Sequence, residues 1–141
     1  MRYYLDTNTL VFVLLDRKQL ESHVRDITSD LGNAFYVSSA CAQELIHLCQ
    51  ADRLGYLVGR KKRLEAEDAL ERIRDSGIVI VPINETHLAS LATLPFFSDH
   101  HDPTDRMIIA QAIADRLPLI SSDNKFKLYE SHGLELVFNK R

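Results

Sequence analysis

Short hydrophobic runs alternate along the chain with stretches in which apolar residues recur at helical spacing. The runs rich in β-branched and aromatic residues predict strands at RYYLD (2–6), AFYVSS (34–39), IVIVP (78–82), PLISS (118–122) and LELVF (134–138). The intervening periodicity predicts helices at roughly 8–16, 19–31, 40–50, 60–76 and from 103 onward, with short helices ETHLASL after Asn84 and NKFKLYES after Asp123. Strands separated by helices are typical of βαβ crossovers, so we expect an α/β fold with a central parallel sheet. The apolar runs IVIV and PLI predict central strands that are covered on both faces.

Length and composition favour one soluble domain over residues 1–141. The 141 residues are 45% hydrophobic and 26% charged, with a net charge of −3, so the whole molecule is not a polycation. There is no apolar stretch of 18 residues and no cleavable leader, so we expect neither a membrane span nor a signal peptide. Cys41 and Cys49 are eight residues apart in one predicted helix, too far for a disulfide, which favours a reducing, cytoplasmic setting.

Four acidic residues are candidates for one edge of the sheet. In open α/β sheets, ligands bind outside the carboxyl ends of the strands. Asp6 and Asp123 each end a predicted strand, and Glu44 lies early in the helix after the second strand, so these three can reach the same edge. The position of Asp105 depends on how residues 83–103 return to that edge, which the pattern leaves open.

Each of these acids also has a purely structural interpretation. The segment Asp102-Pro103-Thr104-Asp105 is a typical helix start, with Asp102 as the N-cap and Asp105 placed as in a capping box. Asp123 can cap the following helix and Asp6 can form an Asx turn. Glu44 lies on or beside the apolar stripe of its helix, where an unpaired charge is costly.

Carboxylates that gather at one place repel one another, and a divalent cation removes that repulsion. Oxygen ligands alone suit Mg²⁺ or Mn²⁺ rather than zinc, and such ions assist phosphodiester hydrolysis. His100 and His101 could touch phosphate or transfer a proton, although solvated loop histidines are the commoner case. The basic cluster Arg60 to Arg63 could likewise contact phosphate or be a solvated helix end.

Four segments together resemble a known family. YYLDTNTLVFVL (3–14), SSACAQEL (38–45), HDPTDRMIIAQA (101–112) and LISSDNKF (119–126) are similar, in this order, to PIN-domain nucleases and more narrowly to the VapC-like toxins of bacterial toxin–antitoxin pairs. The match runs from residue 2 to about 138. The resemblance assigns the catalytic acids to Asp6, Glu44, Asp105 and Asp123, with Asp6, Asp105 and Asp123 as metal ligands. Asp102 is the additional acid of a DPxDR subgroup.

The resemblance implies a three-layer α/β/α fold and an endoribonuclease that depends on Mg²⁺ or Mn²⁺. It places a hydroxyl beside the last acid, from Ser121 or Ser122, and we take Thr7, Asn8 and Ser122 with Asp102 as supporting residues. It also implies RNA as substrate, a homodimer and a small antitoxin partner. The main alternative is a PIN fold that serves as a noncatalytic binding module. A haloacid-dehalogenase-type phosphatase fits poorly, because it expects an acid where this chain has Asn8. A receiver domain also fits poorly.

Overall fold

The computed structural model describes residues 1–59 and 63–141. Within these residues the chain forms β1 (Arg2–Leu5), α1 (Thr7–Leu15), η1 (Arg17–Gln19), α2 (Ser22–Ser29), β2 (Ala34–Ser38), α3 (Ser39–Gln50), α4 (Gly55–Val58), η2 (Ala66–Asp68), α5 (Ala69–Asp75), β3 (Val79–Val81), α6 (Glu85–Thr93), α7 (Pro103–Asp115), β4 (Leu119–Ser121), η3 (Asn124–His132) and β5 (Leu136–Phe138). The η elements are 3₁₀ helices.

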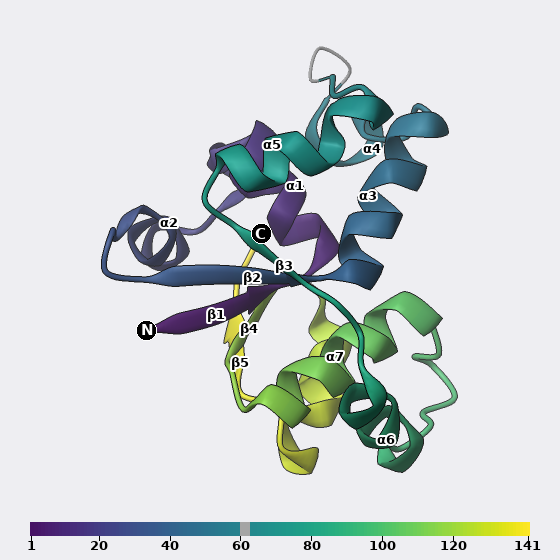
Figure 1. Ribbon diagram of the computed structural model, residues 1–141. Coiled ribbons are helices and arrows are strands. Elements are labelled where there is room, and N and C mark those ends of the chain that lie inside the picture. The colour runs from purple at the N-terminus through teal and green to yellow at the C-terminus, as the bar shows by residue number, and fades with distance from the viewer. Residues whose placement is uncertain (60–62) are drawn as a thin grey trace.

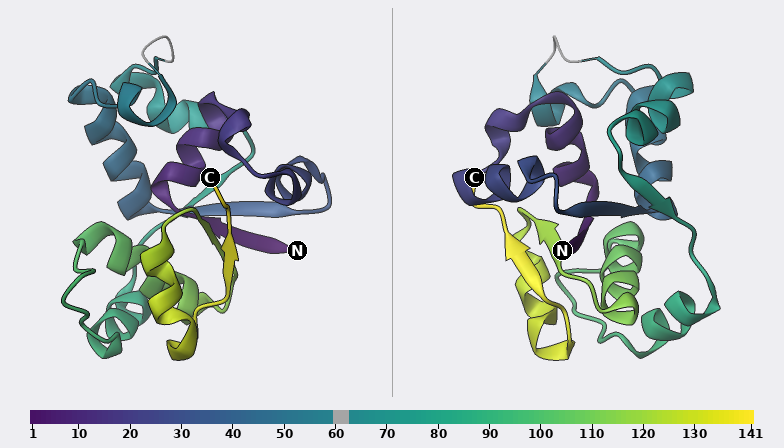
Figure 2. Two further views of the ribbon diagram at one scale, coloured as in Figure 1. Left: turned by 180° about the vertical axis from the view of Figure 1, so that it is seen from behind. Right: turned by 60° about the vertical axis from the view of Figure 1, so that its left-hand side comes forward.

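The strands build one parallel sheet in the order β3-β2-β1-β4-β5. Helices α1, α3, α4 and α5 lie on one side of it, and α6, α7 and η3 lie on the other (Figures 1 and 2). The predicted three-layer α/β/α fold is therefore confirmed. From β1 the chain progresses through β2 to β3, whereas β4 and β5 extend the sheet in the opposite direction. The boundary between β1 and β4 is thus the point where the order reverses, which is where open α/β sheets place their ligands.

Two sequence predictions need correction. The run IVIV does not form a central strand: β3 is an edge strand and Val79 is 50% exposed. The helix predicted over 60–76 begins later, with 3₁₀ geometry at Ala66, and residues 63–65 are not helical. Its first part, with most of the basic cluster, lies outside the described residues, while Arg63 is exposed. By contrast, all three residues of β4 are buried, as expected for a covered inner strand.

The core on both sides of the sheet fixes the elements that carry the acids. Helix α7 buries seven consecutive residues, Arg106 to Ala112, because it packs against both α6 and α3. Helix α1 is similarly enclosed, with Leu10, Val11 and Phe12 fully buried. Both thiols, Cys41 and Cys49, are free. No helix within the described residues has the length and apolar character needed to cross a membrane.

Candidate metal centre

Asp6 follows β1 directly and is 5% exposed. Its Oδ1 accepts a hydrogen bond from the Thr9 backbone N–H at 2.9 Å, which caps α1, and its Oδ2 accepts from Ser121 Oγ at 2.6 Å. Burial raises the pKa of the Asp6 carboxyl, and the bonds from Ser121 and Thr9 oppose this rise. The residue is therefore an N-cap rather than a simple Asx turn, and it has a second oxygen directed toward β4.

Asp123 lies two residues after β4 and is the N-cap of η3. Its Oδ1 accepts from the Lys125 backbone N–H at 2.9 Å, and its own backbone N–H donates to Ser121 Oγ at 3.0 Å. Ser121 thus contacts both acids at this edge. Ser122 is directed elsewhere, since its Oγ accepts from Asn139 Nδ2 at 2.8 Å. Of the two serines in the motif, Ser121 supports Asp6 and Asp123, and Ser122 anchors the chain near its C-terminus.

Asp105 reaches the same region from the first turn of α7. Asp102 caps this helix, because its Oδ1 accepts from the Asp105 backbone N–H at 3.1 Å, and Pro103 occupies the first turn. The Asp105 side chain remains free of the capping bond and is 25% exposed. Burial raises the pKa of Asp105 to about 8, and the negative charges of Asp102, Asp6, Glu44 and Asp123 add to the rise.

Glu44 approaches from α3 and is half-buried. Burial raises its pKa, the charge of Asp102 adds to this, and the Thr104 hydroxyl opposes it. Thr7 is buried in the first turn of α1, where its hydroxyl also lowers the pKa of Glu44. Asn8, the other residue taken as support, is half-buried in that same turn.

The burial of His100 differs from the sequence prediction. Its place in a polar loop predicts a solvated side chain, but it is 4% exposed, whereas its neighbour His101 is exposed as predicted. The cause lies in distant residues. Arg106 donates to the Pro95 carbonyl at 2.6 Å and so holds the 94–100 loop against α7, and Tyr129 of η3 lies 2.7 Å from His100 Nδ1. Nothing in the local sequence distinguishes the two histidines.

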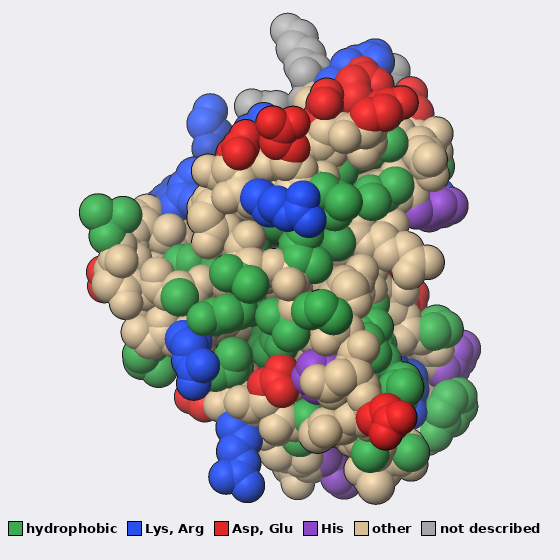
Figure 3. Space-filling model, viewed as in Figure 1, with side chains coloured by type: hydrophobic (Ala, Val, Ile, Leu, Met, Phe, Trp, Pro, Cys, Tyr) green, Lys and Arg blue, Asp and Glu red, His purple; other side chains and the backbone are tan. Residues whose placement is uncertain are grey.

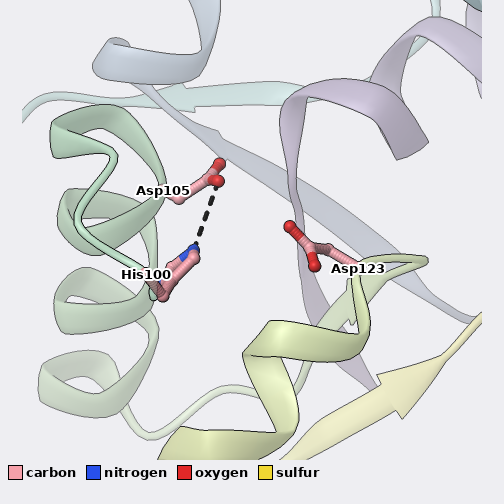
Figure 4. A group of neighbouring side chains, drawn as sticks. All are labelled: His100, Asp105 and Asp123. Atoms are coloured by element: carbon pink, nitrogen blue, oxygen red, sulfur yellow. Dashed lines mark ion pairs between the residues drawn. The ribbon is translucent and has the colours of Figure 1, made fainter. Parts of the chain in front are cut away.

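His100, Asp105 and Asp123 form a tight group of side chains that could hold a metal ion. One ligand atom from each lies within 4.8 Å of the others, and His100 Nε2 is 3.4 Å from Asp105 Oδ2. Figure 4 shows the three side chains directed into one space between α7 and the start of η3. A surface pocket opens over them, lined by Asp99, His100, His101, Asp102, Asp105, Asp123 and Lys125. Asp6 and Glu44 lie outside this tight group, although their charges act on Asp105.

The charge balance of this region fits a cation. Over residues 1–59 and 63–141, no Lys or Arg forms an ion pair with any of the four acids. One buried polar atom next to them, His100 Nε2, also has no hydrogen-bond partner in that part of the chain. Buried polar groups are normally satisfied, and a bound ion is one way to satisfy this nitrogen. Crowded carboxylates beside an unpaired ring nitrogen are an arrangement that a divalent ion would stabilise.

These features define a parallel α/β domain with a carboxylate site near the boundary between β1 and β4, where the strand order of the sheet reverses. The family model for the PIN domain matches residues 3–131, and the chain therefore belongs to the PIN domain family. No protein of curated function matches the sequence significantly.

Solved structures support this assignment at the level of the fold. VapBC2 from Rickettsia felis, bound to a DNA fragment of its promoter, matches with a TM-score of 0.69 and 17% identity, over 99% of this chain and 100% of the other. VapBC-1 from nontypeable Haemophilus influenzae matches with a TM-score of 0.67 and 18% identity, over 98% of both chains. DNA-bound VapBC from Salmonella typhimurium matches with a TM-score of 0.65 and 17% identity, also over 98% of both chains. PIN domains are generally nucleases that use divalent metals, so family membership supports a hydrolase with a metal centre.

Proposed function

We propose that this protein is an endoribonuclease that hydrolyses RNA phosphodiester bonds with Mg²⁺ or Mn²⁺. The observation that carries the proposal is the set of acids near the β1–β4 boundary, none of which forms an ion pair with a Lys or Arg within the described residues. The site lies under an open pocket, so a single strand or a loop of RNA can reach it from solvent.

Each acid has a role that follows from its surroundings. Asp105 and Asp123 face each other across the pocket and would hold the ion, together with Asp6, which Ser121 fixes in place. Glu44, on another helix and half-buried, would orient the attacking water and receive its proton. When bound, the ion would supply Lewis acidity at a phosphoryl oxygen and make water more acidic. Asp102 would act by capping α7.

The same proposal includes a toxin role. The DPTDR segment and the fold shared with VapBC complexes support a VapC-like toxin of the DPxDR subgroup, acting in the cytoplasm and inhibited by a small antitoxin. A groove over α3, α5 and β3 has four apolar lining residues, Ala42, Ile46, Leu70 and Ile80, beside the polar residues Ser39, Gln43, His47, Gln50 and Arg74. Hydrophobic side chains gather on the middle of the face seen in Figure 3, below the acidic side chains at its top. Such a surface suits an antitoxin helix or a second copy of the chain in a homodimer.

The test is cleavage of single-stranded and stem-loop RNA by the purified protein with Mg²⁺, with Mn²⁺ and with EDTA. We expect cleavage with either metal, none with EDTA, and a loss of about 100-fold or more in Asp105→Asn, because a ligand is removed. Asp105 is preferred to Asp6 for this test, since its side chain does not cap a helix. Asp26→Asn, an exposed acid on α2, is the matched control and should retain full activity.

A noncatalytic binding module is the alternative. It would retain RNA or protein binding while showing no metal-dependent cleavage of any substrate. Equal metal-dependent cleavage by the wild type and Asp105→Asn would contradict the proposed site.

A further inference from the structure

The imidazole ring of His100 is held in one orientation. It packs edge-on against Phe126 and Tyr129, with ring centroids 5.7 and 5.4 Å away, and its Nδ1 lies 2.7 Å from the Tyr129 hydroxyl. The antiparallel bridge between Phe97 and His100 fixes the backbone on the other side. The ring therefore presents its second nitrogen, Nε2, to a fixed place in the pocket.

That nitrogen is buried and has no hydrogen-bond partner within residues 1–59 and 63–141. The Asp105 carboxylate is 3.4 Å from it, longer than a good N–H···O bond. Two ligands at right angles on one Mg²⁺- or Mn²⁺-sized ion are about 3 Å apart, by the usual metal–ligand lengths. The spacing of Nε2 and Asp105 Oδ2 is therefore compatible with two neighbouring ligands of one ion.

Metal binding at Nε2 needs the tautomer in which Nδ1 carries the hydrogen. The Tyr129 hydroxyl can accept that hydrogen, because its own hydrogen can go to the His100 carbonyl at 3.4 Å. Arg106 Nη1, 3.5 Å from the same hydroxyl, favours its role as an acceptor. A histidine that donates from one nitrogen to a fixed oxygen and leaves the other free has the usual arrangement of a metal-binding histidine.

We propose that His100 Nε2 is a ligand of the bound cation, beside the Asp105 and Asp123 carboxylates, and that this nitrogen makes the site select Mn²⁺ over Mg²⁺. Mg²⁺ strongly favours oxygen ligands, whereas transition-metal ions accept imidazole. The inference rests on the metal site of the proposed function and changes its chemistry from all-oxygen to mixed nitrogen and oxygen. Tyr129 is then a positioning residue, which acts through His100.

The experiment measures metal binding directly, without RNA. Electron spin-echo spectroscopy of the Mn²⁺-loaded protein detects nitrogen bound to the ion, and calorimetry compares the affinities for Mn²⁺ and Mg²⁺. We expect a coupled nitrogen in the wild type and in the matched control His101→Gln, and its loss in His100→Gln. Mn²⁺ should bind the wild type more than about 10-fold tighter than Mg²⁺, and His100→Gln should lose about 10-fold in Mn²⁺ affinity. Circular dichroism verifies folding, and His100→Asn replaces His100→Gln if that variant does not fold.

The possible failures are distinguishable. Bound Mn²⁺ without a coupled nitrogen in the wild type, or a coupling that persists in His100→Gln or His100→Asn, overturns the role of His100 and leaves the carboxylate site of the proposed function intact. Equal affinities for Mn²⁺ and Mg²⁺ overturn the selectivity. A wild-type protein that binds neither ion contradicts both this inference and the metal dependence of the proposed function.

Discussion

The Ser121 hydroxyl lies 2.6 Å from Asp6 Oδ2 and accepts the Asp123 backbone N–H at 3.0 Å. One side chain at the end of β4 thus connects the acids that follow β1 and β4, the two strands where the sheet order reverses. Through these two hydrogen bonds Ser121 holds the buried Asp6 carboxylate and the backbone of the partly exposed Asp123 in fixed positions.

Replacing Ser121 by Ala should weaken the fold and the metal site together. The substitution leaves a buried Asp6 oxygen and the Asp123 N–H without their partner, which costs about 1–3 kcal/mol. It also removes a bond that lowers the pKa of Asp6, so protons should compete better with the ion. Chemical denaturation and calorimetry with Mn²⁺ measure the two effects. Ser122→Ala, whose hydroxyl bonds to Asn139 instead, is the control and should leave Mn²⁺ affinity unchanged.

Asp105→Asn should stabilise the metal-free protein at alkaline pH. The pKa of Asp105 is raised from 3.8 to about 8 in the fold, so the native state binds this proton more tightly than the unfolded chain does. The associated stability is fully present below pH 3.8 and is lost as pH rises through about 8. Asn cannot ionise, and we expect it to gain about 1–3 kcal/mol over the wild type at pH 8.5, a value discounted for partial exposure.

Urea denaturation in EDTA at pH 5 and pH 8.5 checks this pH dependence. The advantage of Asp105→Asn should grow between these two values, while Asp26→Asn should show no such change. A variant that is less stable than the wild type at pH 8.5 would show that Asp105 has a structural role instead of the electrostatic strain inferred here.

The acidic edge could be predicted from sequence because it follows from local rules. Asp6 and Asp123 come after strands, and parallel strands end at one edge of their sheet. Asp105 was uncertain from the pattern alone, because its position depends on how α6 and α7 pack across the sheet. The pattern also could not show which residue joins Asp105 and Asp123 in the tight group. That residue is His100, and Asp6 and Glu44 lie outside the group.

Other features depend on contacts between distant residues. The order of the strands decides that β3 lies at an edge, and no periodicity within IVIV reports that order. Ser121 and Ser122 are adjacent and chemically identical, and their partners, Asp6 for Ser121 and Asn139 for Ser122, come from distant segments of the chain. The burial of His100 likewise depends on Arg106 and Tyr129, which are 6 and 29 residues away in the sequence.

Asp102 should tolerate replacement by Asn but not by Ala. Its carboxylate caps α7 through the Asp105 N–H, and Asn caps helices about as well as Asp. Asp102→Asn should therefore retain most cleavage activity, while Asp102→Ala should lose about 1 kcal/mol of stability. Thermal unfolding measures the stability of both variants, and an RNA cleavage assay measures their activity. Complete loss of Mn²⁺ binding in Asp102→Asn would show that Asp102 is a ligand and not a cap.

Glu44→Gln should separate metal binding from catalysis. Glu44 lies on α3, outside the tight group that His100, Asp105 and Asp123 form, so the ion should still bind when its charge is removed. The amide cannot take a proton from water, and we expect single-turnover cleavage to slow by about 100-fold or more. Mn²⁺ affinity should fall by less than about 3-fold, whereas Asp105→Asn should lose both affinity and rate. If Glu44→Gln lost Mn²⁺ affinity as severely as Asp105→Asn, Glu44 would be a metal ligand, and another group would have to orient the attacking water.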